Sequence, residues 1–125
     1  MGTDARILIM DDASFTRVCS AILEAEGFQT DSTCPGLHDT EPVDLRGVSL
    51  IITSYPCGRS VLERLGADVP IIVLTDIINV ELLSILRGVE RSYCMVKPIN
   101  YPRFKTLVRG IVEGQVASQG GLNIV

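Results

Sequence analysis

The sequence lacks the features that mark several classes of protein. It has one histidine and no Cys-x-x-Cys pair, so the usual zinc sites are not expected. No segment approaches the roughly 18 consecutive apolar residues that indicate a membrane span. Basic residues are in the minority, with 11 Lys and Arg against 15 Asp and Glu and a net charge of -4. A nucleic-acid surface needs clustered cations, so nucleic acid is not an expected partner.

The cellular compartment is inferred from two further absences. Residues 1–10 place Asp4 and Arg6 beside a short apolar run and contain no small-residue cleavage site, so we expect no signal peptide. Without a secretory route, the four cysteines are expected to be reduced thiols. We therefore predict a cytoplasmic protein without a membrane segment.

Short aliphatic runs are the main feature that the sequence does have. Runs that are apolar at nearly every position are typical of strands buried on both faces of a parallel sheet, and they cover residues 6–10, 49–53, 70–75 and 93–96. A mostly polar run over residues 28–32 suits a strand at the edge of that sheet. With 125 residues, the chain is long enough for one domain.

Between these runs the apolar residues recur with the period of a helix. This spacing predicts helices over residues 14–26, 80–89 and 101–116, with Gly27 as a stop and with Asn79 and Asn100 as N-caps. The connections over 33–47 and 57–68 are poor in helix signals, so we expect a shortened second and third helix. Residues 117–125 have the composition of a linker, which predicts a domain over 1–116 and a flexible tail or linker stump over 117–125.

The alternation of strands and helices indicates βαβ units with right-handed crossovers. We therefore predict a flavodoxin-like (βα)5 fold of the α/β class. It is a three-layer sandwich with a five-stranded parallel sheet.

Polar residues follow the predicted strands at their carboxyl ends, where sites form in open parallel sheets. They are Asp11 and Asp12 after the first strand, Ser54 after the third, Thr75 and Asp76 after the fourth, and Lys97 after the fifth. Two adjacent carboxylates are costly to bring together unless a cation compensates their charge. Mg²⁺ with oxygen ligands, or the ammonium group of Lys97, would serve.

This series resembles the receiver domain of two-component response regulators, the CheY-like family. ILIMDDASFTR is similar to that family's first strand and acidic pair, PIIVLT to its fourth strand, and MVKPIN to its Lys-Pro strand end. The resemblance covers nearly the whole chain. It implies that Asp11 and Asp12 hold Mg²⁺, and that Thr75 and Lys97 contact a phosphoryl group.

The sequence departs from the family at the phosphoacceptor, an Asp that ends the third strand. Ser54 stands in its place. A carboxylate is nucleophilic at pH 7, whereas a serine hydroxyl needs a base, and the only histidine, His38, lies in the irregular second connection. The substitution also removes one metal ligand and one negative charge.

Three smaller departures agree with this one. Asp76 follows Thr75 where the family favours a small residue. The aromatic residue that often reorients during activation would fall on Cys94, with Tyr93 displaced by one and expected to face the other side. The 21-residue span from Ser54 to Thr75 is shorter than usual. These features are typical of a degenerate receiver, or pseudo-receiver.

Two hypotheses for function follow. The first is a non-enzymatic signalling module that requires no cofactor. It would bind a histidine kinase, a phosphotransfer protein or an output protein through the fourth helix, fifth strand and fifth helix, and could form a homodimer. The second is a phosphorylatable, Mg²⁺-dependent receiver in which Asp11, Asp12 or Asp76 replaces the usual acceptor. A flavin or nucleotide site is disfavoured because the first loop, DDASFT, would repel phosphate.

The same residues also have simpler interpretations. One carboxylate of the Asp11–Asp12 pair would cap the first helix while the other is solvated. Lys97 would form a salt bridge to Asp11, Asp12 or Asp76. Thr75 would be an ordinary strand-end hydroxyl.

Overall fold

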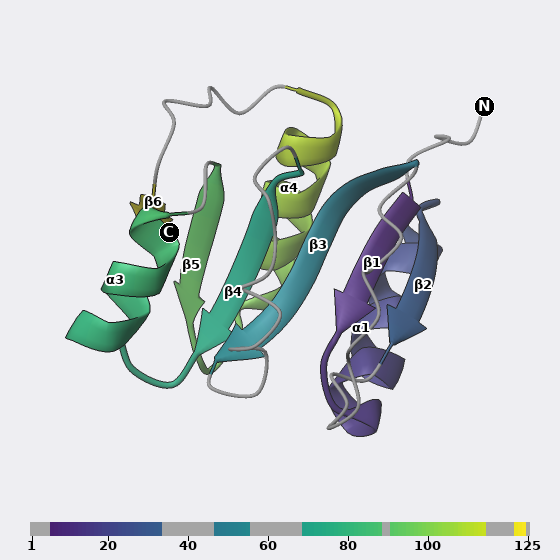
Figure 1. Cartoon of the computed structure of the whole chain (residues 1–125). Coiled ribbons are helices and arrows are strands. Elements are labelled where there is room, and N and C mark those ends of the chain that lie inside the picture. Colours follow the sequence, from purple (N-terminus) through teal and green to yellow (C-terminus); the bar gives the residue numbers. More distant parts are fainter. Residues whose placement is uncertain (1–5, 34–46, 56–68, 89–90, 115–121, 125) are drawn as a thin grey trace.

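The computed structural model describes residues 6–33, 47–55, 69–88, 91–114 and 122–124. Within these residues the chain forms one parallel sheet and three helices (Figure 1). The strands are β1 (Arg6–Met10), β2 (Gln29–Thr33), β3 (Val48–Tyr55), β4 (Ile71–Thr75), β5 (Ser92–Val96) and β6 (Leu122–Ile124). The helices are α1 (Ala13–Ala25), α3 (Val80–Arg87) and α4 (Tyr101–Val112). None of these helices has the length and apolarity needed to cross a membrane.

The first five strands are the five predicted from the sequence, and the predicted fold class is confirmed. They lie in the order β2-β1-β3-β4-β5, the order of flavodoxin-like sheets, with β2 at the edge as expected. The fourth and fifth predicted helices correspond to α3 and α4. The shortened second and third helices were predicted for residues 33–47 and 57–68. These segments lie almost wholly outside the described residues.

Side-chain caps fix where the helices begin. The Asp12 carboxylate accepts a hydrogen bond from the Phe15 N–H at 2.8 Å, and Asn79 and Asn100 cap α3 and α4 in the same way. The helix α4 ends at Val112, four residues before the predicted end. Gly114 adopts a left-handed φ of 71° just beyond it, a conformation that terminates a helix.

The sheet has a sixth strand that the sequence analysis did not predict. Residues 122–124 lie in the segment expected to be a flexible tail, yet they pair in parallel with residues 92–94 of β5. That expectation is wrong for these three residues. An uncovered strand edge presents unpaired N–H and C=O groups that another segment can satisfy. Three residues after a Gly-Gly pair are too few to show a strand periodicity.

Two apolar clusters fill the space between the layers. The helices α1 and α4 cover one face of the sheet, and α3 covers the other (Figure 1). On the first face, Leu23 and Phe104 pack against Ile9 and Ile52. On the second face, Leu82 of α3 packs against apolar side chains that point from the strands to that side of the sheet. The sheet is therefore buried on both sides, which explains the uninterrupted apolar runs of its central strands.

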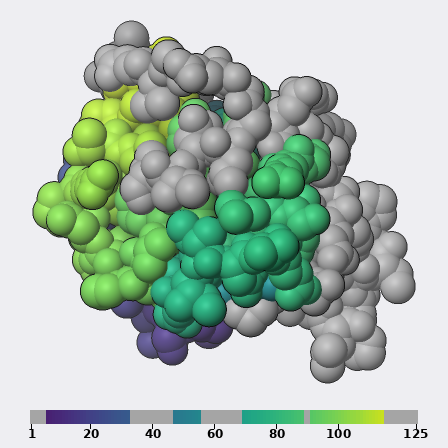
Figure 2. Space-filling view, turned by 90° about the vertical axis from the view of Figure 1, so that its left-hand side faces the viewer, coloured from purple at the N-terminus to yellow at the C-terminus, as the bar shows by residue number. Residues whose placement is uncertain are grey.

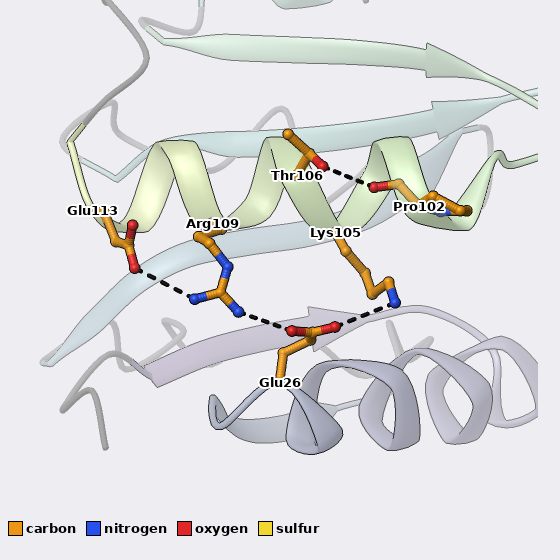
Figure 3. A network of polar contacts seen from close by, with 6 residues as sticks. All are labelled: Glu26, Pro102, Lys105, Thr106, Arg109 and Glu113. Atoms are coloured by element: carbon orange, nitrogen blue, oxygen red, sulfur yellow. Dashed lines mark hydrogen bonds and ion pairs between the residues drawn. The ribbon is translucent and has the colours of Figure 1, made fainter. Parts of the chain in front are cut away.

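A group of charged residues joins the two helices of the first face (Figure 3). Glu26, at the end of α1, pairs with Arg109 of α4 at 2.8 Å and with Lys105 at 3.2 Å. These two partners lower the pKa of Glu26, with the hydrogen bond to Lys105 as the largest cause. The Arg109 guanidinium also lies 5.4 Å from the centre of the Phe28 ring. The contacts fix how α1 and α4 lie relative to each other, although exposed ion pairs contribute modestly to stability.

The thiol of Cys19 lies in the core beneath α1. Its side chain is fully buried, and burial together with the negative charge of Asp11 raises its pKa to about 12. Burial is the larger of the two causes. Cys19 and Cys94 are both free thiols, in agreement with the expected reduced state.

Cys19 should make the stability of the protein depend on alkaline pH. The unfolded thiol ionises near its ordinary pKa of 9.0 while the folded thiol stays protonated, so stability is lost as pH rises above that value. Between pH 8 and pH 10, the free energy of unfolding of the wild type should fall by about 1.4 kcal/mol more than that of Cys19→Ala. Urea titrations at both pH values, under reducing conditions, measure the difference. An identical pH dependence in the two proteins would contradict the assignment.

Candidate functional site

The candidate site lies at the carboxyl ends of the central strands, at the lower edge of the sheet in Figure 1. Met10 pairs with Thr53 in the β1–β3 register, which brings Asp11 beside Ser54. Thr75 pairs with Tyr55 on one side and with Val96 on the other. The topology thus brings the polar residues predicted from four strand ends to one edge of the sheet.

Asp11 and Ser54 form the centre of this site. Each is only 2% exposed, and the Ser54 hydroxyl donates a hydrogen bond to Oδ2 of Asp11. The backbone N–H of Asp12 donates to Oδ1 of the same carboxylate at 2.7 Å. Both oxygens of this buried carboxylate are therefore hydrogen-bonded. Such bonds offset part of the free-energy cost of burying an anion.

A second hydroxyl, on Thr53, supports the same strand end. Its Oγ1 donates to the carbonyl oxygen of Met10 at 2.7 Å, and its side chain is fully buried. Two successive residues of β3 therefore hold the end of β1 from opposite faces of the sheet. The sequence analysis missed this role because a threonine within a strand carries no distinguishing signal.

The two carboxylates of the acidic pair have different roles. Asp12 is exposed and caps α1, which confirms one part of the simpler interpretation. Asp11 is buried, so the expectation that the second carboxylate is solvated is wrong. The reason is the strand geometry, which places Asp11 directly beside Ser54.

The donor set fits Mg²⁺ poorly as it stands. The described part of the chain contains no group of three His, Cys, Asp or Glu residues arranged to hold a metal. Asp11 accepts two hydrogen bonds, and Asp12 is engaged in the helix cap. Mg²⁺ requires near-octahedral oxygen ligands, usually including carboxylates. The neutral Ser54 hydroxyl directs its hydrogen toward Asp11 and adds no charge.

Thr75 and Lys97 form hydrogen bonds at the ends of β4 and β5. The Thr75 hydroxyl donates to the carbonyl oxygen of Ile77 at 2.7 Å, so it closes the turn after its own strand. The backbone N–H of Lys97 donates to the carbonyl oxygen of Thr75 at 2.7 Å. Thr75 is buried, and Lys97 is partly exposed. The Thr75 hydroxyl is thus engaged within its own turn.

The expected salt bridge of Lys97 is not formed. Among the residues with described positions, the ion pairs join Arg6 to Asp31, Glu26 to Lys105 and Arg109, and Arg109 to Glu113. None links Lys97 to Asp11, Asp12 or Asp76. Asp11 already receives its hydrogen bonds from Ser54 and a backbone amide, and Asp76 is exposed to solvent.

Cys94 and Tyr93 lie on opposite faces of the sheet. Cys94 packs on the α3 side with Leu86, whereas Tyr93 packs on the α4 side with Val108. Side chains alternate along a strand, so a shift of one residue changes the face. Tyr93 is 3% exposed and belongs to the core. An aromatic side chain is thus missing from the position where the resemblance placed a movable one.

Exposed apolar side chains gather near the same end of the sheet. Four of the five large apolar side chains that are exposed in the described residues follow β4 or lie around the end of β5. They are Ile77 (66%), Val80 (83%), Val96 (40%) and Tyr101 (36%). Figure 2 views this side of the molecule, with α3 in the middle and α4 to its left. These four residues form the apolar rim of the site.

Comparison with known proteins gave likenesses in structure only. No family model and no curated protein matches the chain by sequence. A response regulator receiver domain of Methanospirillum hungatei JF-1 superposes with a TM-score of 0.67 and 22% identity, over 89% of this chain and 95% of that one. A two-component response regulator of Clostridium difficile gives 0.65 and 17%, over 90% and 99%. An orphan response regulator of H. pylori gives 0.67 and 18%, also over 90% and 99%.

These likenesses span nearly the full length of the solved chains, and they agree with the resemblance noted in the sequence. At such low identities a structural match establishes architecture and not activity. The strand order and the position of the polar strand ends support the same conclusion. The chain has the fold of CheY-like response regulator receiver domains.

Proposed function

We propose that the chain is a receiver-like signalling module of a two-component system, which acts by binding proteins and is not phosphorylated at Ser54. The observation that carries this proposal is the buried hydrogen bond from Ser54 to Asp11. It lies at the strand end where the resemblance places an acceptor carboxylate. The proposed module is not an enzyme and needs no cofactor.

The environment of Ser54 argues against phosphoryl transfer to its oxygen. Phosphoryl transfer depends on a positioned nucleophile and on cations that neutralise the developing charge. Ser54 is 2% exposed, and the Asp11 carboxylate to which its hydroxyl is bonded would repel an incoming phosphoryl group. The Lys97 ammonium forms no ion pair with Asp11 that would place it against this hydroxyl.

The same hydrogen bond lets the site keep its shape without a metal. A third carboxylate at position 54 would lie directly against Asp11, and two buried anions need a cation between them. A serine removes one charge and supplies a donor in its place. The Asp11 carboxylate is then hydrogen-bonded without a cation, and the site has one arrangement. Such a site suits a scaffold that presents a constant surface.

The proposed partner surface is formed by α3, β5 and α4. The apolar rim, Ile77, Val80, Val96 and Tyr101, lies on this side, and exposed apolar groups of this kind mark protein interfaces. A histidine kinase, a phosphotransfer protein, an output protein or a second copy of the chain would bind there. The net charge of -4 disfavours nucleic acid as the partner. We place this activity in the cytoplasm.

Incubation with phosphodonors tests the absence of phosphorylation. Wild-type protein treated with Mg²⁺ and acetyl phosphate should keep its intact mass, because the Ser54 hydroxyl is buried and hydrogen-bonded to the Asp11 carboxylate. Beryllofluoride should likewise leave its amide spectrum unchanged. A stable adduct heavier by one phosphoryl group would favour the alternative, a phosphorylatable receiver with a non-standard acceptor. Peptide mapping would then identify Asp11, Asp12, Asp76 or Ser54 as the acceptor.

Restoring the missing carboxylate should create a dependence on Mg²⁺. Ser54→Asp places a second buried anion against Asp11, so the variant should be less stable than the wild type in EDTA. Added Mg²⁺ should raise its thermal midpoint, since a ligand that binds only the folded state stabilises it.

Ser54→Asn is the matched control, because asparagine has nearly the same volume as aspartate and carries no charge. The wild type and Ser54→Asn should show no Mg²⁺-dependent shift of the thermal midpoint. An equal shift in all three proteins would show that Mg²⁺ binds independently of position 54, and would count against the proposed role of Ser54.

A further inference from the structure

The outer edge of β5 carries a short partner strand. β6 pairs with residues 92–94 of β5. The inner edge of β5 is fully paired with β4, from Ser92 to Val96. β5 is therefore a rigid five-residue strand with three positions of its outer edge covered.

The covering strand is a weak occupant. Fixing the backbone of three residues costs conformational entropy of the same order as the gain from the few ladder hydrogen bonds they form. β6 touches the sheet only at β5 and lies next to α3. A strand edge held by so short a segment is a template for an additional strand once that segment leaves.

The surroundings favour an apolar segment in that position. A parallel strand that continued past Ile124 would run along Met95 and Val96 toward the apolar rim. Val96 is 40% exposed and Val80 is 83% exposed at that end of the sheet. The chain's own occupant, Leu-Asn-Ile, has apolar residues at both ends. Strand addition of this kind takes its affinity from main-chain hydrogen bonds and its specificity from alternate side chains.

We propose that the outer edge of β5 is a strand-accepting site for an extended apolar peptide segment of a partner protein, and that residues 122–124 occupy it in cis and compete with that segment. The proposal deepens the proposed function, because it rests on the same face as the partner surface. It adds the mode of binding, parallel strand addition, and a regulatory role for the tail.

Hydrogen exchange tests the cis occupation in the full-length chain. Alternate β5 amides point toward β4 and toward β6, so the inward amides serve as an internal control. Two single variants, Asn123→Pro and Ile124→Pro, are compared. Neighbouring N–H groups point in opposite directions, so one of the two variants loses the N–H that donates to β5. That variant is called the effective proline variant. Outward β5 amides should exchange at least about tenfold faster in the effective proline variant than in the wild type or Asn123→Ala. Unchanged exchange in both variants would overturn the proposal.

A peptide tests whether the uncovered edge accepts a strand. The probe is a fluorescently labelled peptide, GGLNIV, taken from the chain's own sequence. Its control is the peptide with the same proline as the effective variant, GGLPIV or GGLNPV. The GGLNIV probe should bind the effective proline variant at least about tenfold more tightly than the wild type, because the tethered segment competes at a high local concentration. Equal affinity for the two proteins, equal binding of the control peptide, or no binding to either protein would overturn the proposal.

These results are independent of the phosphorylation experiments. A phosphorylated Ser54 would overturn the proposed function and leave the exchange data as they are. Unprotected β5 amides would overturn strand docking and leave the role of Ser54 untouched.

Discussion

A buried carboxylate must be paired, and this requirement governs the end of β1. Asp11 is 2% exposed at the centre of a sheet edge, and it receives hydrogen bonds from the Ser54 hydroxyl and the Asp12 amide. The hydroxyl comes from β3, 43 residues away in sequence. It binds the first and third strands together where both leave the sheet. It also supplies the Asp11 carboxylate with a neutral hydrogen-bond donor, and such bonds to an ionised group are among the stronger ones.

The consequence for Lys97 shows how the interaction propagates. An ammonium at the end of β5 would ordinarily be drawn to a carboxylate on the same edge, yet Lys97 forms no ion pair with the described acidic residues. A neutral donor beside Asp11 satisfies that anion first. The backbone N–H of Lys97 donates to the carbonyl oxygen of Thr75, which extends the hydrogen bonding between β4 and β5 past Val96.

The second constraint is the edge of the sheet. β2 closes one edge with a mostly polar sequence, as its composition predicted. The other edge would have ended at β5, an apolar strand with side chains buried on both faces. β6 covers part of it, and the exposed apolar rim lies just beyond. Partner binding and tail pairing therefore concern the same strand, which links the proposed surface to its proposed regulation.

The sequence by itself determined the first five strands, the helices α1, α3 and α4, and the identity of the residues at the strand ends. Strands that are apolar on both faces are buried most favourably between two layers of helices. The helix caps Asp12, Asn79 and Asn100 are local sequence signals. Only the tertiary structure decided the partners: that Ser54 and not Lys97 satisfies Asp11, that Thr53 anchors Met10, and that residues 122–124 form a strand. Pairing between strands depends on register and on which donors reach a buried group first. Those distances exist only after the chain has folded.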